Sequence, residues 1–306
     1  MRPSPILPEL PEGEELKRIL LLVDYSNILY RSYFGSIKEW ENRPWLPILR
    51  FLDSLRLCVQ RSKPEGIPVE VIFAGESRQK LERSKIDPSY KSQRAPIKHD
   101  IFRKFRKVLA LILRDMDTHL VSRPGAEADD IIASVVSYVN PLDDPPWMPT
   151  SKKTSTTTIV FSNDKDLYQL LKYQRCYIFK NPGVFYTPEL FRSEYGFDPY
   201  EFTAYKAMIG DKSDNVSGVN GIGPVNAKKH ILDGTVPTDD PEFIKSIGLI
   251  ALNYDLDVPT VGDKLTFDFD LEHGRDYIFE YYGRDTAAFD EIQLAMKMLY
   301  SVYYRK

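Results

Sequence analysis

Acidic side chains gather in four short groups along the chain, most of them directly after an apolar run. The eight carboxylates are Asp24, Glu127, Asp129, Asp130, Asp164, Asp166, Asp211 and Asp214. Carboxylates packed together repel one another unless a cation lies among them. Ligand sets made only of oxygen suit magnesium or manganese, and two such ions can activate a water and stabilise the leaving oxygen of a phosphodiester. The pattern therefore indicates metal-dependent chemistry at a phosphodiester.

Each group taken alone has a simpler explanation. Asp and Glu are common in the first turn of a helix, where they stabilise its start. The group that begins at Glu127 follows Gly125 closely and fits that explanation. Asp24 fits it less well, because an acid at the end of a buried strand needs a partner. Four groups at successive element ends favour a shared metal site over four separate caps.

The spacing within two of the groups predicts shared faces. Asp164 and Asp166 would point to one side of an extended chain, and Asp211 and Asp214 would share a face of a helical turn. The sequence has no HExxH phrase and no Cys/His ligand spacing, so nothing supports a zinc site.

Alternating strands and helices must position these side chains. Short apolar runs predict buried strands, and apolar residues at helical spacing predict helices between them. The expected strands are 19–23, 69–73, 119–121 and 158–161, and the expected helices include 101–113 and 131–139. This alternation predicts an α/β fold with a mainly parallel central sheet flanked by helices, whose sites lie at the carboxyl ends of the strands.

Composition narrows the class of protein. The net charge is −3 and the isoelectric point about 5.9, so total charge gives no sign of nucleic acid. Basic residues nevertheless concentrate between Arg78 and Lys107, apart from the clustered acids. One region could thus hold an anion and the other a metal. The sequence shows neither a membrane-length apolar run nor a signal-peptide pattern, so we expect a cytoplasmic location with Cys58 and Cys176 as free thiols.

Three phrases, in this order, resemble the 5′-nuclease (flap endonuclease) family: EADD, then SNDKDL after a strand, then GDKSDNVSGVNGIGPVNAKKHI. The resemblance runs from about residue 19 to 232, and it extends to the phage 5′-exonucleases and ribonuclease H proteins and to the 5′-nuclease domain of bacterial DNA polymerase I. It implies a flexible arm over residues 1–18 and a PIN-like nuclease core over 19–180, with a helical arch at about 78–107. Residues 181–306 would form a helical DNA-binding portion, with a helix–hairpin–helix motif and a C-terminal segment of unassigned role.

The resemblance places all eight carboxylates at metal-ligand positions for two Mg²⁺ or Mn²⁺ ions. One further position departs from the family. The family has an Asp directly after the second strand, in a phrase like FDG, whereas VIFAGES puts Ala74 there. Alanine cannot bind a metal. The sequence therefore leaves open whether this chain is active, and whether Ala74 is natural or engineered.

The segment RSKIDPSYKSQRAP resembles the start of the family's arch, through which a single-stranded 5′ end passes. Lys91 and Arg94 match the basic pair that faces the scissile phosphate, and the resemblance gives them the catalytic role. Lysine offers phosphate a point charge and arginine a bidentate fork. Tyr90 is expected to stack on a base. Without the family, a solvated basic helix would explain this segment equally well.

The phrase GVNGIGP resembles a hairpin whose backbone amides grip one duplex strand. Gly221 and Gly223 permit close backbone approach, and Pro224 would start a helix with free N–H groups for a phosphate. Lys228 and Lys229 lie one turn on. The family often holds a K⁺ ion in this hairpin. A tight structural turn remains the plain alternative for either glycine.

These expectations combine into a structure-specific 5′-nuclease that acts by two-metal-ion catalysis, in replication. Its substrates would be flap, nicked or gapped DNA, with RNA primers on DNA as a further class. We expect a monomer with no membrane contact, in a bacterial or phage-infected cell. Two alternatives stay open: a non-catalytic protein that binds branched DNA, and a PIN-like ribonuclease. The hairpin argues against the ribonuclease, because a small RNA-cleaving domain has no need of a duplex grip.

Overall fold

A six-stranded sheet lies at the centre of the computed structural model, which describes residues 7, 16–39, 42–64, 66–94, 97–116, 118–140, 156–180, 182–258, 273–283 and 286–303. The strands are β1 (Arg18–Asp24), β2 (Val69–Ala74), β3 (His119–Val121), β4 (Thr156–Phe161), β5 (Cys176–Lys180) and β6 (Val184–Tyr186). Their order is β3-β2-β1-β4-β5-β6, and all neighbours are parallel except β5 and β6. The four expected strands are therefore present, in a mainly parallel sheet.

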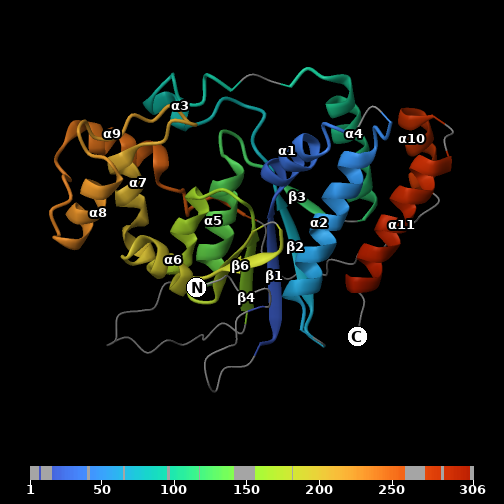
Figure 1. Cartoon of the computed structure of the whole chain (residues 1–306), viewed down its shortest axis with the longest axis horizontal. Helices are drawn as coiled ribbons and strands as arrows, with labels where there is room; N and C mark the ends of the chain where they lie inside the picture. The colour runs from blue at the N-terminus through green and yellow to red at the C-terminus, as the bar shows by residue number, and fades with distance from the viewer. Residues whose placement is uncertain are drawn as a thin grey trace.

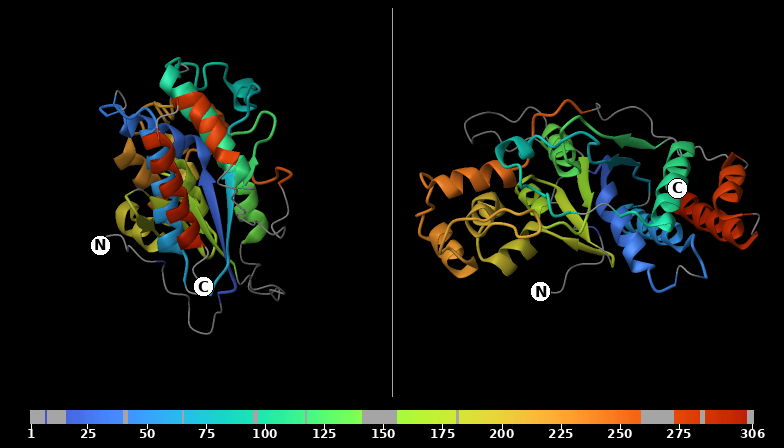
Figure 2. Two further views of the ribbon diagram at one scale, coloured as in Figure 1. Left: turned by 90° about the vertical axis from the view of Figure 1, so that its right-hand side faces the viewer. Right: turned by 90° about the horizontal axis from the view of Figure 1, so that it is seen from above.

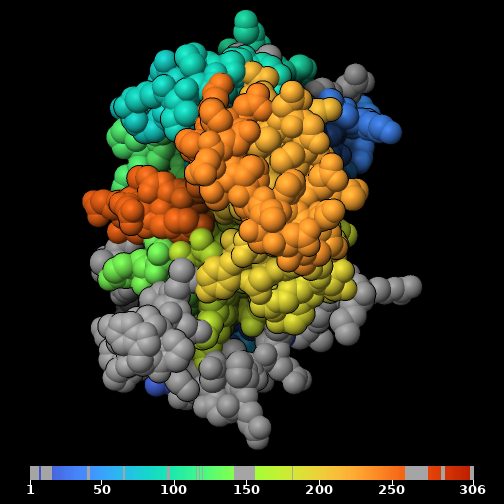
Figure 3. Space-filling model, turned by 90° about the vertical axis from the view of Figure 1, so that its left-hand side faces the viewer, coloured from blue at the N-terminus to red at the C-terminus, as the bar shows by residue number. Residues whose placement is uncertain are grey.

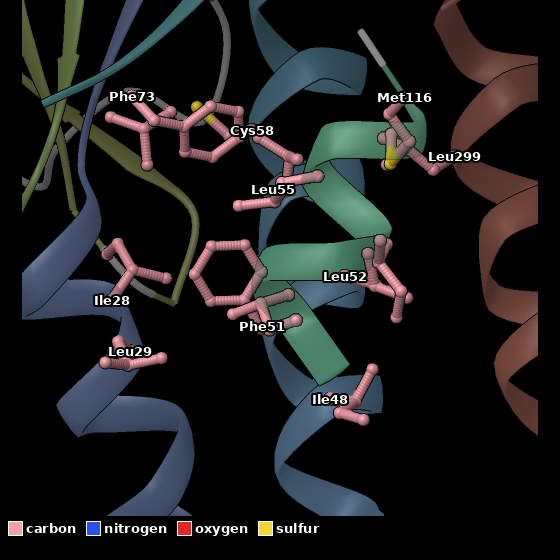
Figure 4. Close-up of a cluster of buried hydrophobic side chains, with 14 of the residues drawn as sticks. Ile28, Leu29, Ile48, Phe51, Leu52, Leu55, Cys58, Phe73, Met116 and Leu299 are labelled. Carbon is pink, nitrogen blue, oxygen red and sulfur yellow. The ribbon is translucent and has the colours of Figure 1, made fainter. Parts of the chain in front are cut away.

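One face of the sheet is covered by five helices. They are α1 (Tyr25–Gly35), α2 (Leu46–Ser62), α4 (Asp100–Asp115), α10 (His273–Tyr282) and α11 (Thr286–Tyr303). Their apolar stripes meet in one buried cluster, where Phe51 and Leu55 of α2 lie between Ile28 of α1 and Leu299 of α11 (Figure 4). This cluster is the larger of the two hydrophobic clusters that hold the strands in position, one on each face of the sheet.

The opposite face carries the second layer (Figure 1). Its elements are α5 (Ala128–Val139), the 3₁₀ helices η1 (Asp166–Lys172) and η2 (Pro199–Glu201), α6 (Pro188–Tyr195), α7 (Phe202–Ile209), α8 (Pro224–Leu232) and α9 (Pro241–Ile250). Buried residues of these elements form a second cluster with the strands. A short helix, α3 (Arg83–Ile86), lies on the segment between β2 and α4.

Side-chain alternation along the strands decides which face each strand end presents. In β1, Ile19, Leu21 and Val23 belong to the first cluster, and Leu20 and Leu22 belong to the second. Asp24 follows in the second set, so its side chain leaves the sheet on the side of α5. The sequence pattern thus aims the last residue of β1 at the helix that carries Glu127 and Asp129.

The division of the chain differs from the expected one. The sheet continues past residue 180 into β6. The C-terminal helices α10 and α11 pack on α4 and α2, so residues 273–303 belong to the α/β core. Helices α8 and α9 lie at the opposite end of the molecule (Figure 2). The expected arm at 1–18 falls mostly outside the described residues. No helix within the described residues has the length and apolar character to cross a membrane.

A tight turn after α7 positions two of the acids and depends on glycine. Gly210 has φ 73° and ψ −174°, a conformation that is nearly exclusive to glycine. A Cβ at this position would lie 2.6 Å from the backbone nitrogen of Gly218. Asp211 pairs with Val216 across the turn. The geometry of Asp211 and Asp214 therefore rests on a close contact between two backbone segments.

Replacing Gly210 with Ala should lower the free energy of unfolding by about 3 kcal/mol or more, because backbone strain and steric overlap add. Gly234→Ala is the matched control: Gly234 also has a positive φ, but no atom lies within 4 Å of an added Cβ. That change should cost about 1 kcal/mol. Urea denaturation of both variants measures the difference, and equal losses would mean that the turn has room to relax.

Candidate functional site

The carboxyl ends of β1 and β4 and the start of α5 border a cavity of about 380 Å³. Eight charged residues line it: five acids, two bases on the arch segment, and Arg31 on α1. They are Asp24, Arg31, Glu76, Lys91, Arg94, Glu127, Asp129 and Asp164. Part of the site predicted from the sequence therefore lies around one cavity, at the expected carboxyl edge of the sheet.

Asp24 is buried at the end of β1, where it caps α1. One carboxylate oxygen accepts from the backbone nitrogen of Asn27 at 3.0 Å and the other from Oγ of Ser162 at 2.8 Å. Burial raises the pKa of Asp24 to about 6 although both hydrogen bonds lower it, and the charges of Asp164 and Glu76 raise it further. The group is held in place but is not neutralised by a cation of the protein.

Asp129 projects from the first turn of α5 and forms no hydrogen bond or ion pair with the described part of the chain. Burial raises the pKa of Asp129 well above its ordinary value, with further contributions from Asp164 and Asp24. Asp164 itself accepts from the backbone nitrogen of Asp166 at 2.9 Å. Three acids from three elements thus repel one another around the cavity.

Arg83 neutralises two of the predicted ligands behind the cavity. Its guanidinium donates to both oxygens of Asp130, at 2.7 and 2.6 Å, and to Glu127 at 2.5 Å. All three side chains are buried. Asp130 also accepts from the backbone nitrogens of Glu127 and Asn253 and does not line the cavity. Its predicted role as a metal ligand remains a prediction, and its contacts in this structure are those of a structural ion pair.

Lys91 and Arg94 reach over the cavity from the segment between α3 and α4. Lys91 pairs with Glu127 and lies 3.6 Å from Asp214, and Arg94 pairs with Asp214. Both cations therefore border the cavity, each engaged by a carboxylate, and their role at the scissile phosphate stays a prediction.

Tyr90 differs from the expectation. Its ring is 6% exposed and its hydroxyl donates to Glu127 at 2.9 Å. The ring packs with Val216, Leu249 and Ile250. A base cannot stack on a ring that is covered in this way, so the structure contradicts that role. Tyr90 instead ties the arch segment to the turn after α7.

A second acidic group forms around Lys206 of α7. The Lys206 ammonium lies 2.8 Å from Asp166 and 2.6 Å from Asp211. Burial raises the pKa of Asp166 to about 6, although Lys206 opposes this. For Asp211, the ammonium and hydrogen bonds from Ser213 outweigh burial and hold the pKa below its usual value.

The expected shared faces are therefore not observed in either group. Asp164 lines the cavity while Asp166 turns to Lys206, and Asp211 turns to Lys206 while Asp214 turns to Arg94.

The donor set fits a hard divalent cation in its chemistry. It consists of oxygens and is largely buried, and the charge of Asp164 helps to raise the pKa of both Asp24 and Asp129. Among the described residues, however, no three Asp, Glu, His or Cys side chains converge as placed closely enough to hold one ion. Part of the reason lies in the contacts above, since Lys91 and Arg94 draw Glu127 and Asp214 toward themselves.

Ala74 lies beside Asp24 in the register of β1 and β2 and is buried. An acid at this position would have been the neighbour of Asp24. The next residue but one, Glu76, lines the cavity. The strand therefore supplies no oxygen at its end, but a carboxylate follows two positions later.

The glycine-rich hairpin forms an exposed surface before α8. Gly221 has φ 77°, and an added Cβ at Gly221 or Gly223 would meet no atom within 4 Å. Gly223 caps α8 without a side-chain hydrogen bond, and Pro224 begins the helix. Lys229 is exposed and Lys228 half-buried. Figure 3 shows the arch segment, in cyan, directly above the α8–α9 region, in orange. The hairpin is thus open to a ligand on the same face as the arch.

Four charged residues of the site were not identified from the sequence: Arg31, Arg83, Lys206 and Glu76. Arg83 was part of the basic stretch, but nothing local distinguishes it from its neighbours. Lys206 precedes Asp211 by five residues on a helix, which gives no sign that it faces two acids. Glu76 carried a usable signal, because strand alternation puts it on the same face as Ala74.

Arg83→Met should lower the free energy of unfolding by about 3–5 kcal/mol, because it leaves Asp130 buried without its cation and Glu127 with Lys91 alone. Arg103→Met is the control, since the Arg103–Asp100 pair is exposed and should contribute almost nothing. Urea denaturation near neutral pH compares the two. A loss at Arg83 no larger than that at Arg103 would contradict the assignment of Arg83 as the counter-ion of this pair.

Sequence comparisons point to one family. Residues 19–196 match the model of the 5′-3′ exonuclease, N-terminal resolvase-like domain. The chain is 31% identical over 218 residues to a thermostable DNA polymerase I of Thermus aquaticus, which covers 70% of this chain and 24% of that protein. It is 28% identical over 229 residues to a 5′-3′ exonuclease of Halalkalibacterium halodurans, covering 72% of each. The chain thus spans about a quarter of the length of the polymerase relatives.

Solved structures agree on the fold. The T5 D15 protein co-crystallised with metal ions superposes with a TM-score of 0.58 at 17% identity, over 92% of this chain and 100% of that one. Flap endonuclease-1 from Methanococcus jannaschii gives 0.54 at 15% identity, over 94% and 93%. Together with the matched domain and the acids at the carboxyl edge of a mainly parallel sheet, these likenesses show that the chain belongs to the 5′-3′ exonuclease (5′-nuclease) family.

Proposed function

We propose that the protein hydrolyses phosphodiester bonds near the 5′ ends of flap, nicked or gapped DNA, with RNA primers on DNA as a further substrate class, in replication. The observation that carries this proposal is the cavity in which Asp24, Glu127, Asp129 and Asp164 face Lys91 and Arg94. A phosphodiester needs both a cluster of acids for cations and basic groups for its own charge. The relatives named as 5′-3′ exonucleases support the same reaction.

Two divalent cations, Mg²⁺ or Mn²⁺, form part of the proposal. Asp24, Asp129 and Asp164 would hold one, with Glu127 and Asp214 available once their present partners release them. Asp166 and Asp211, on either side of Lys206, are the candidates for the second. Cations in such positions lower the pKa of a water and offset charge on the leaving oxygen.

The protein's own groups have separate roles in this reaction. Lys91 and Arg94 would exchange their carboxylate partners for the oxygens of the scissile phosphate, with Arg94 binding in a bidentate manner. Ser162 and the backbone of Asn27 hold Asp24 in a fixed orientation. Arg83 keeps the start of α5 in place, and so fixes Asp129 relative to the sheet.

The hairpin before α8 would bind the phosphates of one duplex strand. Helix N-terminal N–H groups attract anions, and Gly221 and Gly223 leave room for close approach. A K⁺ ion at the Gly221–Pro224 hairpin belongs to the same proposal. A monomer in a bacterial or phage-infected cell remains an expectation from the sequence.

One alternative has an observation in its favour. Ala74 removes an oxygen beside Asp24, and the acids do not converge on one point as placed. A protein that binds branched DNA without cutting it would have these features. The two functions differ in one respect: a restored acid should create activity in a site that otherwise retains the family's groups.

Ala74→Asp should raise the single-turnover rate of flap cleavage by about 10²-fold or more at saturating Mg²⁺, because a missing ligand misplaces the attacking water. DNA affinity should change little, since Lys228 and the hairpin lie on other elements. The measurement uses a labelled 5′-flap DNA with both forms. Equal rates would show that the site does not need this ligand, and no cleavage by either form would favour the binding protein.

Replacing both Lys228 and Lys229 with Ala should weaken binding to all duplex-containing substrates alike. The slope of log affinity against log salt should fall in magnitude by about 1–2, reflecting the lost phosphate contacts. Fluorescence anisotropy with two unrelated duplex sequences at several salt concentrations measures this. Lys245→Ala serves as a control on α9, where the ammonium pairs with Asp87 at 2.6 Å. A strong sequence preference, or a slope that does not change, would exclude the hairpin as a phosphate grip.

A further inference from the structure

We propose that Glu76 replaces the carboxylate missing at Ala74 as a ligand of the divalent cation; this inference rests on the proposed function. Glu76 lies two residues beyond Ala74, the last residue of β2, and borders the same cavity as Asp24, Asp129 and Asp164.

The backbone beyond β2 stays extended, which sets the direction of Glu76. Gly75 donates to the carbonyl of Val121 at 2.8 Å, and Ser77 donates to the carbonyl of Ala126 at 3.0 Å. Amides two residues apart thus point to the same neighbouring segment, as in a strand. Side chains 74 and 76 consequently leave on the same face. Ala74 belongs to the hydrophobic cluster on the α5 side, so Glu76 is directed to the side where Asp24 and Asp129 lie.

Glu76 must turn back along the strand to act as a ligand, and it already lines the same cavity as Asp24. Two residues of extended chain move the Cα by about 7 Å along the strand. A glutamate has one more methylene than the aspartate it would replace, and its carboxylate can turn back over Gly75. The electrostatic effect of Glu76 on Asp24, which raises the pKa of Asp24, supports this proximity.

Glu76 is exposed and forms no hydrogen bond or ion pair with the described residues. A nearby cation in the cavity is Arg94, whose pKa it helps to raise, although Arg94 itself pairs with Asp214. It borders a second hollow that contains Arg78 and Arg106, yet it pairs with neither. In contrast, Glu82 in the same loop pairs with Lys85 at 2.5 Å and lines neither hollow. A carboxylate that forms no ion pair at the rim of this cluster can add a charge to a metal site without breaking an existing ion pair.

The role of Glu76 differs from that of the missing aspartate in one respect. A ligand that reaches in from further along the strand would retain the cation but would not reproduce the position of the attacking water. The chain would then bind metal in spite of Ala74 and still gain rate from Ala74→Asp. Once an aspartate occupies position 74, Glu76 should become dispensable.

Calorimetric titration of Mn²⁺ into the full chain, without DNA, tests this without relying on turnover. The set comprises the parent, Glu76→Gln, the control Glu82→Gln, Ala74→Asp and the double variant Ala74→Asp/Glu76→Gln. Glu76→Gln should weaken Mn²⁺ binding about tenfold or more, and Glu82→Gln should leave it unchanged. In the Ala74→Asp background, Glu76→Gln should change the affinity by less than about twofold, because the two carboxylates act at one site.

Affinities equal for Glu76→Gln and Glu82→Gln would overturn the role of Glu76. Mn²⁺ binding retained in both variants would leave the proposed function intact. A parent chain that binds no Mn²⁺ while Ala74→Asp binds it would also overturn the role of Glu76, and would favour a protein that binds branched DNA without cutting it. Failure of both the parent and Ala74→Asp to bind Mn²⁺ would contradict the metal site and the proposed function together.

Discussion

Repulsion between buried carboxylates is the interaction on which the rest of the site depends. The fold brings acids from β1, α5 and the segment after β4 to one edge, and each needs a compensating group. Asp24 has two hydrogen bonds, Asp130 has Arg83, and Asp166 and Asp211 share Lys206. Asp129 has none of these among the described residues, and its pKa is raised accordingly. Around the cavity the negative charge of the carboxylates is not fully offset, and a cation bound there would offset it.

The two hydrophobic layers stabilise the sheet against this repulsion, because they hold the strands in position without any contribution from the acids. Residues of α1, α2, α4 and α11 hold one face and α5 holds the other. Alternation then sends Asp24 toward α5 without any specific contact being required. Arg83 joins the arch segment to the same helix, so the basic residues Lys91 and Arg94 are positioned by the ion pair that also holds α5. The arch segment and the acidic edge of the sheet are therefore linked by the same ion pairs.

Much of the fold followed from the sequence because the signals were local. Continuous apolar runs located β1, β2, β3 and β4, and the family phrases located the acids. Strand β6 has only three residues beside Gly183, too short for a periodic pattern. The stripe of α11 shows an apolar face but not its partner, so its contact with α2 could not be foreseen. Tyr90 was misjudged because its burial depends on Val216 and Leu249, which are distant in sequence. Long-range pairing likewise concealed Arg83 and Lys206.

The central claim is that the acids at the carboxyl edge of the sheet form a divalent-cation site. Anomalous scattering from crystals soaked in Mn²⁺ tests it most directly, because it locates the ion without relying on turnover. The account predicts a peak within about 2.0–2.6 Å of oxygens of Asp129 and of at least one of Asp24 and Asp164. Peaks found only elsewhere, or none at this edge at saturating Mn²⁺, would contradict it.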